Sequence, residues 1–399
     1  MGKKWRCLAG MLGLIVLGLL AGCLKNTTTT TNNGTGALYV ATQGDSLLSN
    51  FSIELSNGTL TTFGTAVASG TTPIAMILTP DGNTIFMLNS SGGSNDACGS
   101  PQGTITAYTV NSDGNLTVSG SAMDAGTNPH GLAMDSAGKF LFVADQGSPP
   151  SLPSCSAGIA GAPVIFSVSG TTLTAVSQPP SLVFGNQPSG VAVTPDGKYL
   201  YVPNQIDGTV SAFSVNSSGV LTQLGNSPYT VGTAPTAALV TADGNFLYVA
   251  NTGSNNVSAF TVCDNASPSC VTPDGSLTAS SGSPFSAGLG PVAMTEDPSN
   301  TFLYVADEQS NQVSQYKISA GTGVLTPLSP GAISTGVSPV SLAAITGPTV
   351  STVTTDYLYV TNIGGTSISV YSYVTTTGAL SVVGAPVTTG GQPSAVVVK

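Results

Sequence analysis

The only histidine in this 399-residue chain is His130, which lies in the segment Asn128-Pro129-His130-Gly131. The next apolar run along the chain ends at Asp145. An imidazole beside a carboxylate can take up or release a proton near neutral pH, and could serve as a general base or acid that activates water. The alternative is structural: His130 fills its position and forms local hydrogen bonds, while Asp145 stabilises a turn.

Both residues belong to a unit that occurs seven times along the chain. Each unit contains Gly-x-x-Pro, two short apolar runs that each carry an aromatic residue, and then a glycine shortly before a leucine. Turns such as Pro195-Asp196-Gly197 suit a tight hairpin between the first two strands, because Asp-Gly tolerates positive φ. Four short antiparallel strands in a repeat of about 50 residues are typical of a propeller blade. The sequence therefore predicts an all-β fold, a seven-bladed β-propeller over residues 37–399.

The two ends of the repeat region predict how the ring closes. The region begins at residues 37–42 in what should be the second strand of a blade, and ends at residues 394–398 in a first strand. An open ring would leave unpaired sheet edges exposed. We therefore expect the C-terminal strand to pair with the N-terminal blade and complete its sheet.

The ring also predicts which loops lie together. The second strand of a blade ends at the face where the first strand begins, so these loops share one rim beside the central channel, and loops on a rigid scaffold often carry function. At this rim we predict ligand-binding side chains at Asn89, Asp96, Gln146 and Asp307. Six of the seven units carry Asn or Asp at the end of the second strand, so turn formation is the simplest role of that position.

Metal and cofactor sites are not indicated. Further acids at the predicted rim are Asp45, Asp207 and Glu308, and calcium prefers such oxygen ligands, but no loop shows a dense acidic pattern. No glycine-rich phosphate loop or Gly-x-Ser-x-Gly elbow occurs in a strand-to-helix context. We therefore predict no metal centre and no cofactor.

Three runs of the chain resemble a known family. Leu247-Tyr248-Val249-Ala250-Asn251, residues 195–202 and residues 255–260 are similar to runs in the YVTN-repeat and lactonase-type, 6-phosphogluconolactonase-like, seven-bladed propellers. The resemblance covers about residues 37–399. It is strong for the fold and weak for the activity, because one fold hosts many functions.

The resemblance also implies a candidate site and reaction. Lactonase-type propellers carry Pro-His at the start of a blade and Asp-x-Gly after the next strand, and these match His130 and Asp145. The implied reaction is hydrolysis of a lactone or ester. The chain has no arginine after residue 22, and no lysine falls at the predicted rim, so a bidentate phosphate clamp is lacking. We therefore expect a neutral lactone or sugar rather than a phosphorylated one.

The N-terminal segment predicts export. Three basic residues precede an apolar stretch at residues 8–20, and Leu20-Ala21-Gly22-Cys23 resembles the lipobox of bacterial lipoproteins. By that resemblance residues 1–22 are a signal peptide, Cys23 is lipidated, and residues 23–36 are a lipid anchor and Thr-rich tether. The protein would be held on a membrane of the cell envelope, at the periplasmic or outer-membrane face. The alternative is a simple secretory signal or an uncleaved anchor.

Four cysteines remain in the repeat region. Cys263 and Cys270 lie in one insertion between the third and fourth strands of a unit, so we expect them to pair. That leaves Cys98 with Cys155, which lie in two long loops of neighbouring units. A shared zinc site is the rival interpretation, but the four thiols divide between opposite faces of the ring.

The composition limits the classes of partner that the chain can bind. The formal net charge is -10, which argues against nucleic-acid binding. The sequence favours a binding module for an envelope protein or a small neutral ligand, at the rim of the second and third units. The alternatives are hydrolysis of a lactone or ester by His130 with Asp145, and a purely structural surface protein.

Overall fold

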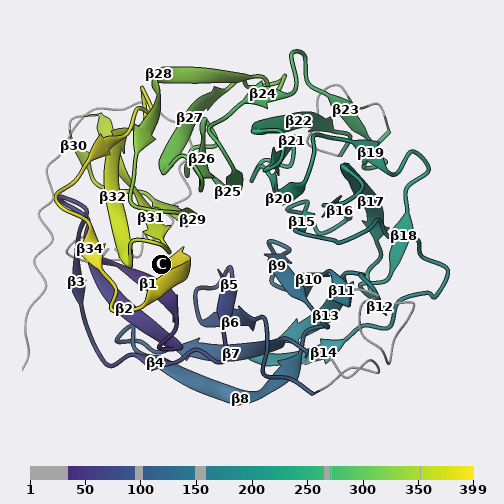
Figure 1. Ribbon diagram of the computed structural model, residues 1–399, viewed down its shortest axis with the longest axis horizontal. Coiled ribbons are helices and arrows are strands. Elements are labelled where there is room, and N and C mark those ends of the chain that lie inside the picture. Colours follow the sequence, from purple (N-terminus) through teal and green to yellow (C-terminus); the bar gives the residue numbers. More distant parts are fainter. Residues whose placement is uncertain (1–34, 95–101, 149–158, 265–269, 271, 351) are drawn as a thin grey trace, which may run out of the picture. The chain divides into compact units, whose positions relative to one another are not determined.

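The computed structural model describes residues 35–94, 102–148, 159–264, 270, 272–350 and 352–399. These residues form seven antiparallel sheets around a central channel (Figure 1). Each sheet has four main strands, here called a to d from the channel outward. The predicted all-β, seven-bladed propeller is therefore confirmed. Within the described ranges, no helix is long and apolar enough to cross a membrane.

The first three blades contain β1 to β14 and the last strand of the chain. In blade 1, strands a to d are β35 (Gln392–Val398), β1 (Thr35–Gln43), β2 (Leu47–Glu54) and β3 (Thr59–Thr62), and β4 (Val67–Ala68) pairs with β2. In blade 2 they are β5 (Pro73–Leu78), β6 (Thr84–Asn89), β7 (Thr104–Val110) and β8 (Leu116–Asp124). In blade 3 they are β9 (Pro129–Met134), β10 (Phe140–Asp145), β13 (Val164–Ser169) and β14 (Thr172–Ala175), and a separate pair joins β11 (Gly147–Ser148) to β12 (Ile159–Ala160).

The other four blades follow in chain order. Blade 4 contains β15 (Ala192–Val193), β16 (Tyr199–Asn204), β17 (Thr209–Val215) and β18 (Leu221–Gln223), with β19 (Tyr229–Thr230) on β17. Blade 5 contains β20 (Pro235–Val240), β21 (Phe246–Asn251), β22 (Asn256–Val262) and β23 (Leu277–Ala279), with β24 (Phe285–Ser286) on β22. Blade 6 contains β25 (Pro291–Glu296), β26 (Phe302–Asp307), β27 (Gln312–Ile318) and β28 (Leu325–Ser334). Blade 7 contains β29 (Pro339–Ile345), β31 (Val353–Asn362), β32 (Ser367–Val374) and β33 (Ser381–Val382), with β30 (Thr349–Val350) on β31 and β34 (Val387–Thr388) on β32.

The ring closes as expected, by pairing of β35 with β1. Leu38 pairs with Val398 and Ala41 with Ala395, in antiparallel register. The Ala37 N–H donates to the Lys399 carbonyl at 3.0 Å, and the Lys399 N–H donates back at 2.8 Å. The last strand of the chain therefore supplies the channel strand of the first blade, and covers the sheet edge that an open ring would expose.

The core lies between the blades. Strand b is buried on both faces, as in β21, because each face packs against a different neighbouring blade. The aromatic residues of strands b and c fill these seams as the sequence predicts; Tyr248 and Tyr316, for example, share the seam between blades 5 and 6.

Tyrosine hydroxyl groups add bonds between blades. In five blades the tyrosine of strand b donates to a glycine carbonyl in the c–d turn of the next blade, as Tyr248 does to Gly323 at 3.0 Å. The others are Tyr39 to Gly114, Tyr201 to Gly275, Tyr304 to Gly378 and Tyr359 to Gly58. Blades 2 and 3 have Phe86 and Phe142 at this position, which lack the hydroxyl. Blade 3, which carries His130, therefore lacks this bond on both of its sides.

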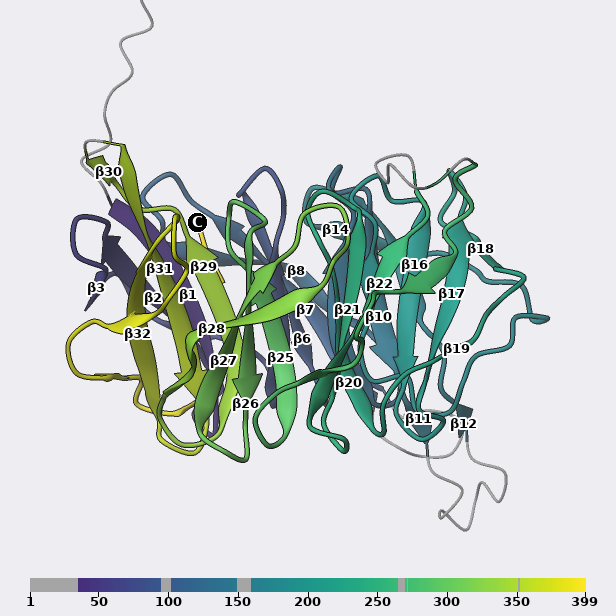
Figure 2. The same ribbon diagram turned by 90° about the horizontal axis from the view of Figure 1, so that it is seen from above.

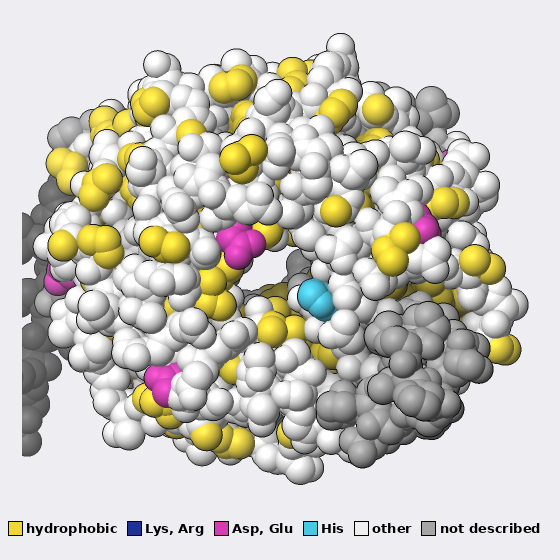
Figure 3. Space-filling view, in the orientation of Figure 1, with side chains coloured by type: hydrophobic (Ala, Val, Ile, Leu, Met, Phe, Trp, Pro, Cys, Tyr) yellow, Lys and Arg dark blue, Asp and Glu magenta, His cyan; other side chains and the backbone are white. Residues whose placement is uncertain are grey.

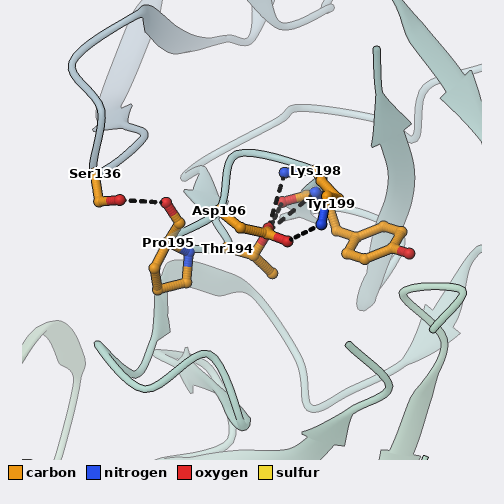
Figure 4. A network of polar contacts seen from close by, with 6 residues as sticks. All are labelled: Ser136, Thr194, Pro195, Asp196, Lys198 and Tyr199. Carbon is orange, nitrogen blue, oxygen red and sulfur yellow. Dashed lines mark hydrogen bonds and ion pairs between the residues drawn. The ribbon is translucent and has the colours of Figure 1, made fainter. Parts of the chain in front are cut away.

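The two faces of the ring carry different connections. In the side view, the β11–β12 pair of a b–c loop and β30 of an a–b connection lie at opposite faces (Figure 2). Figure 4 shows one a–b turn: Thr194 Oγ1 donates to Asp196 Oδ1 at 2.8 Å, and Lys198 Nζ lies 2.7 Å from Asp196 Oδ2. The same turn bonds to blade 3 through Ser136, whose hydroxyl donates to the Pro195 carbonyl. Lys198 is thereby held at the face opposite to the b–c loops.

One predicted disulfide is present. Cys263 and Cys270 are bonded, with their Cα atoms 5.1 Å apart. Cys23, Cys98 and Cys155 lie outside the described residues, as do the predicted signal peptide and nearly all of the predicted tether. Strand β1 begins at Thr35, slightly before the predicted start of the propeller.

Candidate functional site

A repeated β-bulge determines which side chains line the channel. In blade 3, Ala144 pairs with Gly131 but Asp145 pairs with Pro129, so His130 has no partner in the ladder. The same shift follows the motif proline in blades 1, 2, 5, 6 and 7. A bulge re-aims a side chain relative to the regular pleat. The residue after the motif proline therefore faces the channel.

These residues meet in one cavity. A space of about 240 Å³ inside the channel is lined by the post-proline residue of every blade: Ser394, Ile74, His130, Ser189, Thr236, Val292 and Val340, in blade order. His130, Ser189 and Thr236 form a polar arc over blades 3 to 5, whereas Val292 and Val340 form an apolar arc over blades 6 and 7. His130 is the titratable residue among those that line this cavity.

The His130 imidazole faces the open channel and remains exposed (Figure 3). Neither of its nitrogens has a hydrogen-bond partner in the part of the chain that the structure describes. The channel wall takes away part of the water around the ring although the residue is exposed, and this partial desolvation lowers the pKa of His130 from its ordinary value, while the charge of Asp145 opposes the shift. A lowered pKa leaves the imidazole neutral at pH 7, which is the state that can accept a proton.

The Asp145 carboxyl lies beside His130 but does not bond to it. Asp145 Oδ1 accepts the backbone N–H groups of Asn128 at 2.8 Å and of Gly147 at 3.1 Å. Burial raises the pKa of Asp145, and these backbone hydrogen bonds and the His130 charge oppose the rise. Asp145 therefore acts on His130 through its charge and by holding the segment before it. The predicted pair is close in space, without the direct hydrogen bond of a catalytic dyad.

The other Asn and Asp residues at the end of strand b are also structural. A Cβ atom on Gly126 would lie 2.5 Å from Asp145 Cγ, and Gly70 and Gly288 are as close to Asn89 and Asp307. This contact explains the glycine of the Gly-x-x-Pro motif. In blade 1 the equivalent position, opposite the motif proline, is Thr42, and a Cβ on Gly390 would meet nothing within 4 Å.

Asn89 and Asp307, two of the predicted ligand-binding residues, are fully buried and turned into their own blades. Asn89 Nδ2 lies 3.3 Å from Thr104 Oγ1, and Asp307 Oδ2 accepts the Ser314 hydroxyl at 2.6 Å. Burial raises the pKa of Asp307 to about 6. The structure does not bring these two side chains to the cavity. Asp96 lies outside the described residues.

Gln146, the fourth predicted ligand-binding residue, lies at the mouth of the channel. Its Oε1 accepts from Asn128 Nδ2 at 3.0 Å, and its Nε2 is 3.5 Å from Gln205 Oε1 in the next blade. The sequence analysis did not include Ser189, Thr236 or Gln205 in the site. Their place after the motif proline, or after strand b, was the available signal.

The face around the mouth has little positive charge. No lysine or arginine side chain is visible among the described residues of this face, and an acidic side chain lies across the opening from the histidine (Figure 3). Within the described ranges, no group of three or more His, Cys, Asp and Glu side chains could hold a metal ion.

A closed ring of seven blades, with one imidazole inside its channel, defines a β-propeller with a candidate acid–base site at one mouth. The family model "Lactonase, 7-bladed beta-propeller" matches residues 168–269 and 270–399, more than half of the chain. The chain therefore belongs to the lactonase family of seven-bladed β-propellers.

Solved structures share this fold at low sequence identity. The periplasmic gluconolactonase of Pseudomonas aeruginosa is 20% identical, with a TM-score of 0.71 over 91% of this chain and 98% of that one. A candidate 6-phosphogluconolactonase from Bacteroides fragilis is 19% identical, with a TM-score of 0.69 over 93% and 99%. The hydrazine synthase of Kuenenia stuttgartiensis is 16% identical, with a TM-score of 0.55 over 89% and 100%. These similarities show the fold alone. A comparison with curated proteins finds no match.

Proposed function

We propose that this protein hydrolyses a small neutral lactone in the channel, with His130 as the general base. The observation that carries the proposal is the bulge in β9, which places a neutral imidazole with free nitrogens in the cavity. Family membership and the gluconolactonase name of one structural relative support the same reaction class. They favour it over the binding module that the sequence alone suggested.

The reaction needs one proton acceptor and no cofactor. His130 takes a proton from a water molecule as the water oxygen forms a bond to the lactone carbonyl carbon. The carbonyl is then restored as the ring C–O bond breaks, and the imidazolium returns its proton to the departing alkoxide. The product is a hydroxy acid. Asp145 acts as a positioning residue, because its charge favours the imidazolium and its hydrogen bond holds Asn128.

The cavity supports a small, uncharged substrate with hydroxyl groups. The cavity offers the polar arc of His130, Ser189 and Thr236 beside the apolar arc of Val292 and Val340, so a sugar lactone would meet both hydrogen-bonding and apolar groups. Amide groups of Gln146 and Gln205 extend the polar side at the mouth. The lack of a cation on this face, among the described residues, argues against a phosphate group on the substrate (Figure 3).

Binding without catalysis is the second candidate function. It is favoured by exposed apolar side chains in loops of the same face, Ile206, Leu289 and Val337, which could contact an envelope protein. It is also compatible with the missing Asp145–His130 hydrogen bond. Hydrolysis of glucono-δ-lactone by the wild type, lost in His130→Ala, would support the enzyme; a wild type without activity on any neutral lactone would leave the binding role.

We also propose that the protein is exported and lipid-anchored to the cell envelope through Cys23. The Leu20-Ala21-Gly22-Cys23 segment supports it, and so does the Cys263–Cys270 disulfide, because such bonds persist in oxidising compartments. Incorporation of labelled palmitate into the wild type but not into Cys23→Ala tests the anchor.

A further inference from the structure

The channel mouth carries a second ring of side chains, one from each blade. Each of them follows the Asn, Asp or Thr that pairs with the motif proline. Its own backbone N–H donates to the carbonyl just before that proline, as Glu308 does to Gly290 at 2.8 Å. The same bond joins Gln146 to Asn128 and Thr252 to Ala234. The members in blade order are Gln43, Ser90, Gln146, Gln205, Thr252, Glu308 and Ile363.

Side chains of this mouth ring lean across the seam toward the next blade. Gln43 Nε2 donates to the Pro73 carbonyl of blade 2 at 2.9 Å, and Thr252 Oγ1 donates to the Pro291 carbonyl of blade 6 at 2.6 Å. Both carbonyls belong to motif prolines, directly before residues that line the cavity. Glu308 has the same backbone position in blade 6, so its carboxylate belongs to the same rim.

Glu308 is the charged member of the mouth ring; the other six are neutral. No hydrogen bond or ion pair from its side chain occurs within the described portion of the chain, and the residue is partly exposed. Blade 6 is three positions on from blade 3 in the ring of seven, which places Glu308 across the channel from His130. A ligand bound at His130 therefore lies in the field of a carboxylate that has no ion-pair partner among the described residues.

We infer that Glu308 is a specificity-determining residue, which disfavours anionic lactones and so restricts the site to neutral ones. This inference rests on the proposed function. For a phosphate dianion about 10 Å from the carboxylate in water, each unit of charge removed from position 308 favours the ligand by about four-fold. The effect falls with salt, because the Debye length is about 10 Å at 0.1 M ionic strength.

The kinetic test uses the wild type, Glu308→Gln and Glu308→Lys at low salt. The ratio of kcat/KM for 6-phosphogluconolactone to that for glucono-δ-lactone should rise about four-fold in Glu308→Gln and about fifteen-fold in Glu308→Lys. Rates on the neutral lactone should stay within about two-fold. Glu54→Gln, the same change at an exposed residue that ends β2, should leave the ratio unchanged. A ratio that does not respond to position 308 overturns the inference.

A second readout does not need turnover. The single histidine gives one imidazole signal in the NMR spectrum, and inorganic phosphate is the probe. Phosphate should perturb the His130 signal at lower concentration in Glu308→Lys than in the wild type, even if no lactone is hydrolysed. A failure of the proposed function thus remains distinguishable from a failure of this inference. A His130 signal that responds equally in all variants, or in none of them, overturns the role of Glu308.

Discussion

The carboxyl of Asp145 accepts the backbone N–H of Asn128 at 2.8 Å, and thereby fixes the segment that leads into His130. Asn128 directly precedes β9 and Asp145 ends β10, next to the bulge that turns the imidazole into the channel. Asp145 thus supports the site in two separable ways, through a hydrogen bond and through a charge.

Asp145→Asn separates these two effects. The amide oxygen can still accept the Asn128 N–H, but the negative charge is lost. Because that charge raises the pKa of His130, the pKa of His130 should fall in the variant. The measurement is an NMR titration of the single imidazole. Glu54→Gln, which changes the net charge equally at an exposed site, should leave the titration unchanged; an unchanged midpoint in Asp145→Asn would refute the coupling.

The motif glycine before β9 provides a matched pair of variants. Gly126 has φ +104° and a Cβ there would collide with Asp145, whereas Gly390 has φ +84° and open space. Gly390→Ala should cost about 1 kcal/mol of unfolding free energy from backbone strain alone. Gly126→Ala should cost about 1–3 kcal/mol more, because Asp145 must also move. Chemical denaturation measures both, and equal losses would show that the Asp145 contact is unimportant.

Glu296 breaks the pattern of strand a. At the same register the other blades have apolar residues: Leu78, Met134, Val193, Val240, Ala344 and Val398. Glu296 Oε1 accepts the Ala242 N–H of blade 5 at 2.6 Å, and Oε2 is buried with no hydrogen-bond partner in the described residues. Burial raises the pKa of Glu296 to about 8, and nearby Asp243 and Asp297 add to the rise.

Glu296→Gln should therefore change how stability depends on pH. A carboxyl whose pKa is raised in the folded state lowers the unfolding free energy of the protein as pH rises. For Glu296 this loss occurs between the ordinary pKa of a glutamate and about pH 8. The glutamine keeps an acceptor for Ala242 and cannot ionise. Relative to wild type, it should gain unfolding free energy on the order of 3 kcal/mol at pH 9 compared with pH 4. Urea denaturation at both pH values measures the difference, and a gain independent of pH contradicts the assignment.

The tyrosine bonds between blades predict a local loss of stability. Tyr248→Phe removes a buried hydroxyl that donates to the Gly323 carbonyl. It should cost about 1–2 kcal/mol, because the carbonyl is left without that partner. Tyr199→Phe is the control, since no hydrogen bond from the Tyr199 hydroxyl occurs among the described residues. Thermal denaturation measures the stability of both variants. An equal loss of stability in the two would show that the tyrosine bonds between blades do not stabilise the ring.

Much of the fold was predictable because the repeat is periodic. The Gly-x-x-Pro motif, the aromatic residues and the two chain ends sufficed for seven blades and for the pairing of β35 with β1. The bulge was not predictable, because a one-residue shift in register arises only when strands a and b pair. For the same reason the sequence could not tell that Asn89 and Asp307 turn into their blades, or that Asp145 bonds to Asn128 instead of His130.

The central claim is that a neutral His130 accepts the proton of the attacking water. The most direct test compares the pH dependence of kcat/KM on glucono-δ-lactone, corrected for spontaneous hydrolysis, with the NMR titration of His130 in the same protein. The account predicts that the rate rises with pH and is half-maximal at the pKa of His130, which lies below the ordinary histidine value. A rate that is flat across that titration, or a wild type that does not accelerate the hydrolysis, would contradict it.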